Sequence, residues 1–198
     1  MTQNNPKPLM RRELRQVLAN MSDAERKIKS QAACALVAAS PEFVSANSIM
    51  LFLSMPHELD TSALALRCWQ TGKTVVVPKV SWGQRRMLPV EITSLAAGLT
   101  TSGLGVREPA QGSAFLVNLI DLVIVPGLGF TGDGHRIGRG MGFYDRFLAQ
   151  PEFVGLSCGL CFEEQVVDEV PVLDHDMPLS MLATDKGIRR FAPHCIHQ

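Results

Sequence analysis

The amino-acid sequence predicts an α/β protein: a three-layer, open, mostly parallel sheet with helices on both faces, in a Rossmann-like arrangement. Runs of branched apolar residues such as Leu122–Val125 are typical of strands buried on both faces. These runs alternate with segments of helical periodicity, which favours parallel strands joined by helical crossovers. The 198 residues suffice for a substantial core and no linker-like stretch divides them, so we expect one domain over 1–198.

Two helices are predicted at the N-terminal end. The segment Lys7–Asn20 is basic and helix-compatible, and it places Arg11 and Arg15 on one helical face. This spacing alone is typical of a solvated basic face. Ser22–Glu25 forms a capping box, so a second helix starts there, and Pro41 ends it. The inward stripe of this second helix is predicted to hold Ile28, Ala32, Ala35, Leu36 and Ala39.

The next unit is a strand, a loop and a helix. Ser48–Leu53 has the pattern of a buried strand, and the loop after it carries Glu58. Thr61 or Asp60 can cap the following helix, which Gly72 ends. Ligands bind to α/β sheets at loops of this kind, which makes Glu58 a candidate ligand contact. The alternative, an ordinary exposed carboxylate, is the commoner case for a loop residue.

The remaining elements are mostly strands. We predict them at Thr74–Pro78, Met87–Ile92, Val154–Leu160 and, as the last strand, Leu179–Ala183. Between them we expect a turn or mobile loop at Ser81–Arg86, an irregular crossing at Thr93–Ser113, a short acidic segment at Val166–Pro171 and a turn at Leu173–Asp176.

The chain is organised around the glycine-rich stretch that follows Leu122–Val125. Pro126 removes a backbone donor and ends that strand, and seven glycines follow between Gly127 and Gly142. Apolar residues at helical spacing then predict a helix from near Met141. This order builds an anion site, because glycines let several N–H groups face a phosphate and a helix N-terminus adds partial positive charge.

Arginines support the anion-site interpretation. Arg136, Arg139 and Arg146 lie among the glycines or just after them and add full positive charges. The stretch matches neither the P-loop pattern nor the dinucleotide fingerprint. The alternative is an Ω-loop whose glycines serve only its turns.

Charge and hydropathy exclude several function classes. Lys plus Arg and Asp plus Glu both number 19, so nothing favours nucleic acid or an acidic membrane surface as a partner. The N-terminus is polar, without the apolar core of a signal peptide, and no apolar run reaches membrane-spanning length. We therefore expect a soluble cytoplasmic protein. Small-molecule substrates as its partners, and a monomeric or weakly dimeric state, are further expectations that charge and hydropathy do not themselves establish.

The cysteines do not predict a disulfide framework, because they are five in number and irregularly spaced. Cys158 and Cys161 have the spacing of a redox or zinc motif but lie in an apolar run without a second pair. We expect two buried structural thiols there. His194, Cys195 and His197 could ligate a metal, although a frayed C-terminal tail is the better interpretation.

Motifs along nearly the whole chain resemble one known family. The main ones are Val125–Gly127, Phe130, the turn Arg136–Gly140, and Gly142–Arg146; Arg11–Arg15, Leu53–Met55, Glu58–Thr61, Gly105–Pro109 and His175–Asp176 occur in the family's order as well. In these motifs the chain resembles the 5-formyltetrahydrofolate cyclo-ligases, also called 5,10-methenyltetrahydrofolate synthetases. Two positions depart from the family pattern: Met141 stands where relatives have Gly or Lys, and Arg11 replaces the usual Lys.

The resemblance implies a ligase reaction in folate-dependent one-carbon metabolism. ATP phosphorylates the formyl oxygen of 5-formyltetrahydrofolate, N10 closes onto the formyl carbon, and 5,10-methenyltetrahydrofolate forms with release of ADP and phosphate. Magnesium is the implied cofactor and ATP the co-substrate. Phosphoryl transfer needs positioning and charge neutralisation more than a protein nucleophile, which suits a glycine loop with arginines.

The resemblance also implies the site residues. Arg139 and Tyr144 are the expected catalytic residues, and Asp145 and Asp176 are the expected metal ligands. ATP binding is expected from Arg11, Arg15, Arg136, Ile137, Gly138, Arg139, Gly140, Met141, Gly142, Phe143 and Tyr144. Binding of the folate substrate is expected from Leu53, Glu58, Arg139, Gly140, Met141, Gly142 and Phe143.

Two other functions remain open at this stage. One is a sugar-phosphate isomerase or CoA-transferase relative, since similar α/β folds bind phosphates with glycine loops. No acid–base pair stands out in the loop to support it. The other is a folate- or nucleotide-binding paralogue without turnover, against which the retention of Glu58, Arg139, Tyr144, Asp145 and Asp176 argues.

Overall fold

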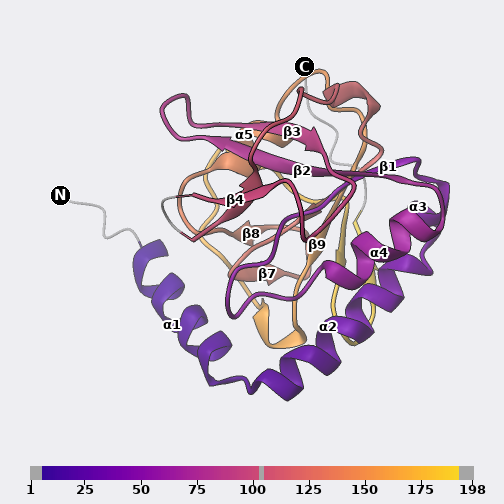
Figure 1. The fold of residues 1–198 in the computed structure, drawn as a ribbon. Helices are drawn as coiled ribbons and strands as arrows, with labels where there is room; N and C mark the ends of the chain where they lie inside the picture. Colours follow the sequence, from indigo (N-terminus) through magenta and orange to yellow (C-terminus); the bar gives the residue numbers. More distant parts are fainter. Residues whose placement is uncertain (1–5, 103–104, 192–198) are drawn as a thin grey trace.

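The chain alternates strands with helices around a central sheet (Figure 1). The computed structural model describes residues 6–102 and 105–191. The helices are α1 (Lys7–Asn20), α2 (Asp23–Ala38), α3 (Pro41–Ser45), α4 (Ser62–Gln70) and α5 (Phe143–Leu148), with 3-10 helices η1 (Val117–Leu119) and η2 (Glu163–Gln165). The strands are β1 (Ser48–Met50), β2 (Thr74–Ser81), β3 (Arg86–Glu91), β4 (Leu99–Thr101), β5 (Arg107–Pro109), β6 (Leu122–Val125), β7 (Gly129–Thr131), β8 (Arg136–Ile137), β9 (Leu156–Leu160), β10 (Val166–Val167), β11 (Met181–Ala183) and β12 (Ile188–Arg190).

The central sheet is mostly parallel, as the sequence predicts. Its strand order is β12-β11-β9-β6-β1-β2-β3. The inner strands β11, β9, β6, β1 and β2 pair in parallel, whereas the edge strands β12 and β3 pair antiparallel with their neighbours. The carboxyl ends of β1, β2, β6 and β9 therefore open on one edge of the sheet, where ligands bind in such folds.

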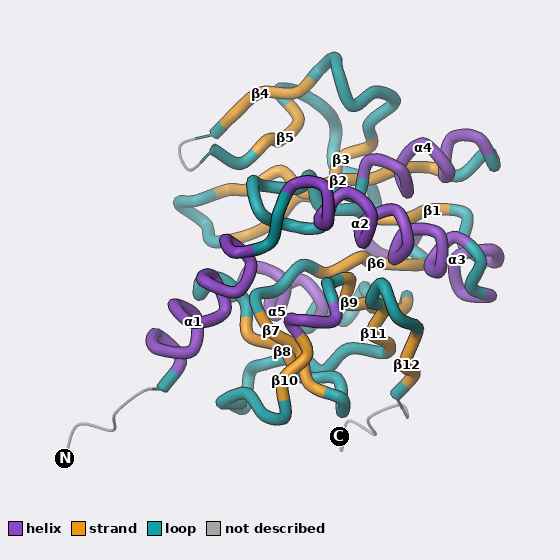
Figure 2. The backbone as a smooth tube through the Cα atoms, turned by 90° about the horizontal axis from the view of Figure 1, so that it is seen from below, coloured by secondary structure: helices purple, strands orange, loops and turns teal. Residues whose placement is uncertain are grey.

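Alternate residues of each central strand enter different cores on the two faces of the sheet. Leu122 and Ile124 of β6 pack with α1, α2 and α4, while Val123 and Val125 pack with α5. Since strand side chains alternate between faces, one short strand serves both layers. The result is the expected three-layer architecture, with α2 and α4 side by side on one face and α5 on the other (Figures 1 and 2).

Helix α1 extends away from α2 after a sharp bend (Figure 1). Arg26 fixes this bend because its guanidinium donates to the carbonyl oxygens of Leu18, at 3.1 Å, and Met21, at 2.9 Å. Leu14 and Leu18 anchor α1 in the core. The position of α1 brings its basic face toward the carboxyl edge of the sheet.

The glycine-rich stretch contains more regular structure than the sequence predicts. Strands β7 and β8 form an antiparallel hairpin inside it, and β10 pairs with β7 to complete a second, three-stranded sheet. The buried amide of Gln165 donates to the carbonyl oxygens of Gly127, at 2.9 Å, and Leu128, at 3.1 Å, and so fixes the entry to the hairpin. Only the turn 138–142 remains as the glycine loop proper.

The predicted inward stripe of α2 is wrong. Its buried residues are Ser30, Ala33, Cys34 and Val37, whereas Ile28 is 67% exposed and Leu36 lies at the surface. Both sets have helical periodicity, because this alanine-rich helix is apolar on two sides. The buried face includes Ser30, a polar residue that is usually exposed. Its hydroxyl accepts a hydrogen bond from Asp60 N at 3.0 Å, so its hydrogen-bonding capacity is met inside the protein.

Other differences concern the extent of strands. The ladder of β1 ends at Met50, although Leu51–Leu53 remain buried. The segment 93–113 holds the β4–β5 hairpin, so it is not wholly irregular, and β12 follows the strand expected to be last. The segment Ser81–Arg86, expected as a turn or mobile loop, is a tight turn, and β2 and β3 extend to both sides of it.

A substitution at Gly159 tests the packing between the two layers. A Cβ at Gly159 would lie 2.8 Å from Phe130 Cε1 and 2.8 Å from Leu179 Cδ1, closer than side chains approach. We expect Gly159→Ala to cost about 1–3 kcal/mol of unfolding free energy, seen as a lower Tm. Gly187→Ala is the matched control, because nothing lies within 4 Å of its Cβ position. Equal Tm values for the two variants would contradict this account of the core.

Candidate functional site

A cleft of about 1070 Å³ opens at the carboxyl edge of the central sheet. Its walls include Phe52–Glu58 after β1, Pro126 and Gly127 after β6, and the end of β2. Residues of α1, the turn 138–142 and the segment 173–177 close the remaining sides. The fold therefore gathers segments that are far apart in the sequence around one cavity.

All the site residues predicted from the sequence line this cleft. They are Arg11, Arg15, Leu53, Glu58, Arg136, Ile137, Gly138, Arg139, Gly140, Met141, Gly142, Phe143, Tyr144, Asp145 and Asp176. Their individual roles stay predictions, but the juxtaposition is a property of the structure.

The turn 138–142 is held against α1 by Arg11. Arg11 Nε donates to Gly138 O at 2.9 Å, and the guanidinium lies beside Gly140. Gly140 and Gly142 have φ values of 108° and 61°, which side chains rarely tolerate. Arg15 lies one turn further along the same face, and its side chain has no hydrogen bond within the described residues. The donors that Arg11 and Arg15 leave unused are available to an anion in the cleft.

A buried ion pair connects β8 to α5. Arg136 Nη2 lies 2.5 Å from Asp145 Oδ1, and Arg136 Nη1 donates to Met177 O at 2.7 Å. The Arg136 side chain is only 5% exposed. Burial lowers the pKa of Arg136 from its ordinary value, and the carboxylates of Asp145 and Asp176 oppose that shift. Arg136 therefore contributes a fixed positive charge to the cleft floor.

Lys7 is a cleft residue that sequence reasoning missed. It is 8% exposed, and its Nζ lies 2.8 Å from Asp176 Oδ2. Burial would raise the pKa of Asp176, but Lys7 and the backbone N–H of Leu173 outweigh it and hold that pKa below its ordinary value. The available signal was spacing, since Lys7, Arg11 and Arg15 recur every four residues on one face of α1.

Glu58 and Arg139 form a second ion pair across the cleft. Arg139 donates to Glu58 Oε1 from Nε at 2.9 Å and from Nη2 at 2.7 Å. Glu58 Oε2 accepts from the backbone N–H of Met55 at 2.9 Å. Both carboxylate oxygens of Glu58 are therefore engaged by the protein, and Glu58 is not the freely exposed carboxylate of the alternative interpretation.

Tyr144 presents a buried hydroxyl to this site. Its Oη has no hydrogen-bond partner within the described residues. Burial, and then the Glu58 carboxylate, raise the pKa of Tyr144 well above its ordinary value, while Arg136 opposes the shift. The phenol is therefore held protonated, as a donor without an acceptor. Such an atom is costly unless a ligand supplies its partner.

The β2–β3 hairpin supplies an apolar wall that the sequence did not predict. Val80, Trp82 and Met87 line the cleft from this hairpin. The Trp82 and Phe143 rings meet edge to face with centroids 5.4 Å apart. The sequence signal was an aromatic residue inside a predicted polar turn.

Asp145 and Asp176 are carboxylates, the ligand type that hard cations prefer. Asp145 Oδ1 is used by Arg136 and by Met177 N, and Asp176 Oδ2 by Lys7 and Leu173 N. Each carboxylate thus keeps one oxygen without a hydrogen bond from the described residues. Mg²⁺ usually takes one or two protein carboxylates together with phosphates and waters. Within the described residues no group of three or more His, Cys, Asp or Glu side chains is placed to hold a metal by itself.

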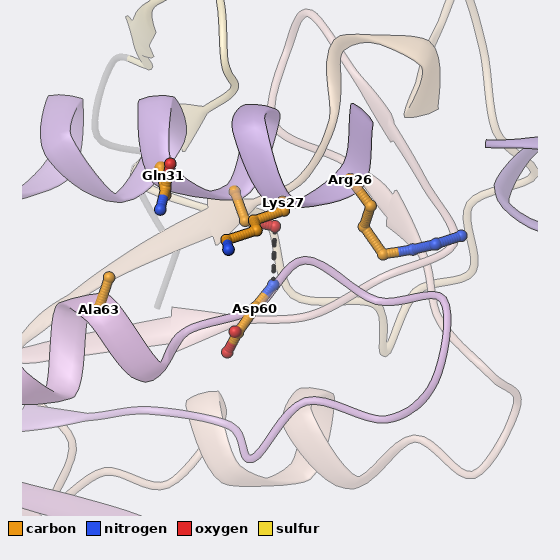
Figure 3. A pocket seen from close by; sticks show the side chains of 6 residues that line it. Arg26, Lys27, Gln31, Asp60 and Ala63 are labelled. Atoms are coloured by element: carbon orange, nitrogen blue, oxygen red, sulfur yellow. Dashed lines mark hydrogen bonds between the residues drawn. The ribbon is translucent and has the colours of Figure 1, made fainter. Parts of the chain in front are cut away.

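A smaller pocket of about 300 Å³ lies between α2 and the start of α4 (Figure 3). Arg26, Lys27 and Asp60 line it, but the Arg26 side chain points away from Asp60 toward the α1–α2 bend. The hydrogen bond from Asp60 N to Ser30 joins its two walls. This pocket holds none of the predicted site residues.

The cysteine prediction is confirmed where the structure describes it. Cys34, Cys68, Cys158 and Cys161 are free and buried, and burial raises the pKa of Cys158 to about 12. His194, Cys195 and His197 lie outside the described residues. Among the helices described, none is long and apolar enough to cross a membrane.

Comparisons with known proteins agree on one family. The model of the 5-formyltetrahydrofolate cyclo-ligase family matches residues 3–185. The chain is 32% identical to the mouse (Mus musculus) 5-formyltetrahydrofolate cyclo-ligase over 186 residues, which cover 89% of this chain and 92% of the mouse protein. It is 29% identical to the Escherichia coli K12 cyclo-ligase over 181 residues, 88% of this chain and 98% of the bacterial protein.

Solved structures show the same fold. The structure of Aquifex aeolicus 5,10-methenyltetrahydrofolate synthetase superposes with a TM-score of 0.82 at 27% identity, covering 97% of this chain and all of that one (100%). A 5,10-methenyltetrahydrofolate synthetase from Mycoplasma pneumoniae gives a TM-score of 0.73 at 22% identity, over 90% of this chain and 98% of its own.

The protonated state of Tyr144 can be tested directly, because it is the only tyrosine in the chain. An ordinary tyrosine ionises near pH 10, with a rise in phenolate absorbance. We expect no such rise in the folded protein up to the pH at which it unfolds, and a normal titration in denaturant. A phenolate band appearing near pH 10 with circular dichroism unchanged would show that the hydroxyl is accessible and not held as a donor.

Proposed function

The chain belongs to the 5-formyltetrahydrofolate cyclo-ligase family, and on that premise we propose that it converts 5-formyltetrahydrofolate and ATP to 5,10-methenyltetrahydrofolate, ADP and phosphate. The observation that supports this most is the gathering of every predicted site residue around one cleft. Family membership also separates the chain from the isomerase and CoA-transferase alternatives.

The chemistry needs an activated oxygen. The formyl oxygen attacks the γ-phosphorus of ATP, and ADP leaves. N10 then attacks the formyl carbon and loses its proton, the carbon–oxygen bond breaks, and inorganic phosphate departs with the former formyl oxygen and that proton. No protein nucleophile takes part, so the protein contributes alignment and compensation of charge.

The cationic end of the cleft suits the ATP phosphates. Arg11 and Arg15 have donors that the protein leaves unused, and Arg136 is a fixed buried charge. The glycine turn 138–142, which Arg11 contacts, lines the same cleft and lets the backbone approach the phosphates. Arginine in place of the family's usual lysine at position 11 keeps the charge and also gives a hydrogen bond to the turn itself.

The opposite end suits the pteridine ring. Leu53, Met55 and Phe143 offer apolar surface, and Glu58 is the carboxylate best placed to accept from the pteridine N–H donors. Arg139 now occupies Glu58 Oε1. We infer that Arg139 leaves Glu58 when both substrates bind and turns to the formyl oxygen as negative charge develops there. This exchange would make Arg139 the link between the two half-sites.

Tyr144 suits a hydrogen bond to the reacting oxygen or to the transferred phosphoryl group. Its hydroxyl is buried and has no partner in the part of the chain that the structure describes, so it can donate to charge that forms during the reaction. Asp145 and Asp176 would hold Mg²⁺. The ion supplies charge neutralisation on the ATP phosphates when bound.

Absorbance decides the proposed activity. The methenyl product absorbs in the near ultraviolet and the formyl substrate does not, so purified protein should produce that band only with ATP, Mg²⁺ and 5-formyltetrahydrofolate together. Binding of both ligands without growth of the band would favour the paralogue without turnover.

Glu58→Gln tests the pteridine contact. The amide keeps the shape but removes the charge and one acceptor, so folate affinity should fall by roughly 1–3 kcal/mol. ATP affinity should stay the same or rise slightly, since Arg139 is released toward the phosphates. Calorimetry measures the two affinities separately. An equal loss of affinity for both ligands, or no loss of folate affinity, would show that Glu58 does not bind the pteridine ring.

Tyr144→Phe should separate stability from activity. Because the hydroxyl has no hydrogen-bond partner among residues 6–102 and 105–191, its removal should leave Tm unchanged or higher, while kcat falls by about 100-fold through the loss of one transition-state donor. The measurements are thermal denaturation and steady-state kinetics of the same preparation. A lower Tm with near-normal kcat would make Tyr144 a structural residue.

Asp145→Asn tests the metal ligand. It should raise the Mg²⁺ concentration for half-maximal rate on the order of tenfold, equivalent to about 1.4 kcal/mol. It should also lower Tm, since Arg136 loses its compensating charge. Asp174→Asn, an exposed carboxylate at the same cleft, is the control. Unchanged Mg²⁺ dependence together with a lower Tm would leave Asp145 as an ion-pair partner only.

A further inference from the structure

Arg146 connects two walls of the cleft that are otherwise separate in the sequence. Its Nε donates to the carbonyl oxygen of Arg85 at the tip of the β2–β3 hairpin, at 2.8 Å. Its Nη2 donates to the carbonyl oxygen of Met141 in the glycine turn, at 2.6 Å. The planar guanidinium thus bridges the hairpin and the turn with one rigid group.

The charge of Arg146 is not used in an ion pair. No carboxylate lies within salt-bridge distance of it in the described part of the chain, in contrast to Arg136 and Arg139. Its contacts are the two carbonyl oxygens and the face of the Phe143 ring, 5.5 Å from the ring centroid. Hydrogen bonds from a charged donor to backbone oxygens fix geometry, which indicates a positional role.

The bridge fixes an aromatic wall. Arg85 has a φ of 50°, an uncommon backbone conformation for a residue with a side chain, and its carbonyl oxygen accepts the hydrogen bond from Arg146 of α5. Trp82 then meets Phe143 edge to face, with Arg146 on the same Phe143 ring. The hairpin begins at β2, the immediate neighbour of β1 in the sheet, so this wall borders the half of the cleft that holds Leu53 and Glu58.

We propose that Arg146 is a positioning residue for the folate substrate, because it fastens the β2–β3 hairpin to the glycine turn and so holds Trp82 and Phe143 as one wall for a flat heteroaromatic ring. The inference rests on the proposed function. Arg146 itself touches no reacting atom. Without the bridge, the hairpin tip is free to move away from Phe143, and the ring loses one side of its binding surface.

The first test separates substrate binding from turnover. Arg146→Gln should raise the KM for 5-formyltetrahydrofolate about tenfold with little change in kcat and in the KM for ATP, as expected for a loss of uniform binding. Arg146→Lys should behave like Arg146→Gln, because an ammonium cannot reproduce the two-pronged geometry. Arg67→Gln removes an exposed arginine of α4 outside the cleft and should change nothing. If Arg146→Gln instead raised the KM for ATP, and Arg146→Lys kept the wild-type KM for ATP, Arg146 would contact a phosphate, and the proposal would be overturned.

The second test asks whether Arg146 acts through Trp82. In a double-mutant cycle, adding Arg146→Gln to Trp82→Ala should raise the folate KM no further than Trp82→Ala alone. Additive effects would overturn the proposed route. In ligand-free protein, backbone amides of Lys79–Met87 should exchange hydrogen faster in Arg146→Gln than in wild type or Arg67→Gln. Equal exchange rates in Arg146→Gln and wild type would show that Arg146 does not hold the hairpin. The proposed function fails separately if the wild-type protein forms no methenyl product.

Discussion

The buried ion pair between Arg136 and Asp145 is the constraint on which the cleft depends. It joins strand β8 of the small sheet to helix α5, and the second donor of Arg136 holds the segment at Met177. A buried pair adds little net stability, because desolvation offsets most of the Coulomb attraction, but either charge alone would be strongly unfavourable. The pair therefore fixes the relative placement of three cleft walls. It also places the Arg136 guanidinium close to both proposed metal ligands, Asp145 and Asp176.

The start of α5 gives four consecutive side chains separate contacts, with Phe143 and Arg146 on the same side of the helix. Gly142 adopts a left-handed conformation, and the helix begins directly after it. Phe143 then packs on the hairpin, Tyr144 places its hydroxyl within the site, Asp145 meets Arg136, and Arg146 reaches the hairpin tip. Because helical residues project about 100° apart, one short turn serves all of these contacts. The glycine turn therefore sets where α5 begins, and it is also a candidate phosphate loop.

The layers could be predicted from the sequence for physical reasons. The candidate site residues came mainly from the family resemblance, and the structure gathers them around one cleft. Alternation of apolar residues in strands and the loops after parallel strands are local signals, and Glu58 and the glycine stretch lie in such loops. Contacts between distant segments are not visible in local patterns. The spacing of Lys7 with Arg11 indicates a shared helical face, but it does not show that the fold brings Asp176, 169 residues away, beside Lys7. Arg146 likewise has its role defined by a hairpin 61 residues earlier.

Errors within elements also have physical causes. In α2, alanine is compatible with either a buried or an exposed face, so periodicity predicts two possible apolar faces. The face that is buried contains Ser30, whose polarity would suggest exposure, but its hydroxyl is hydrogen-bonded inside the protein. In the glycine stretch, the glycines indicated turns but concealed the β7–β8 hairpin, whose pairing places Phe130 opposite Arg136. A glycine-rich composition predicts where the backbone can bend, whereas cross-strand pairing decides where it stays straight.

The central claim is that the cleft aligns the formyl oxygen of the folate with the γ-phosphate of ATP. The most direct test is to label the formyl oxygen of 5-formyltetrahydrofolate with a heavy isotope and to follow the label. If the oxygen attacks phosphorus, its bond to carbon breaks later and the label must leave in inorganic phosphate. Mass spectrometry of the released phosphate should find one labelled oxygen for each methenyl product formed. Unlabelled phosphate, with the label in water, would contradict the account.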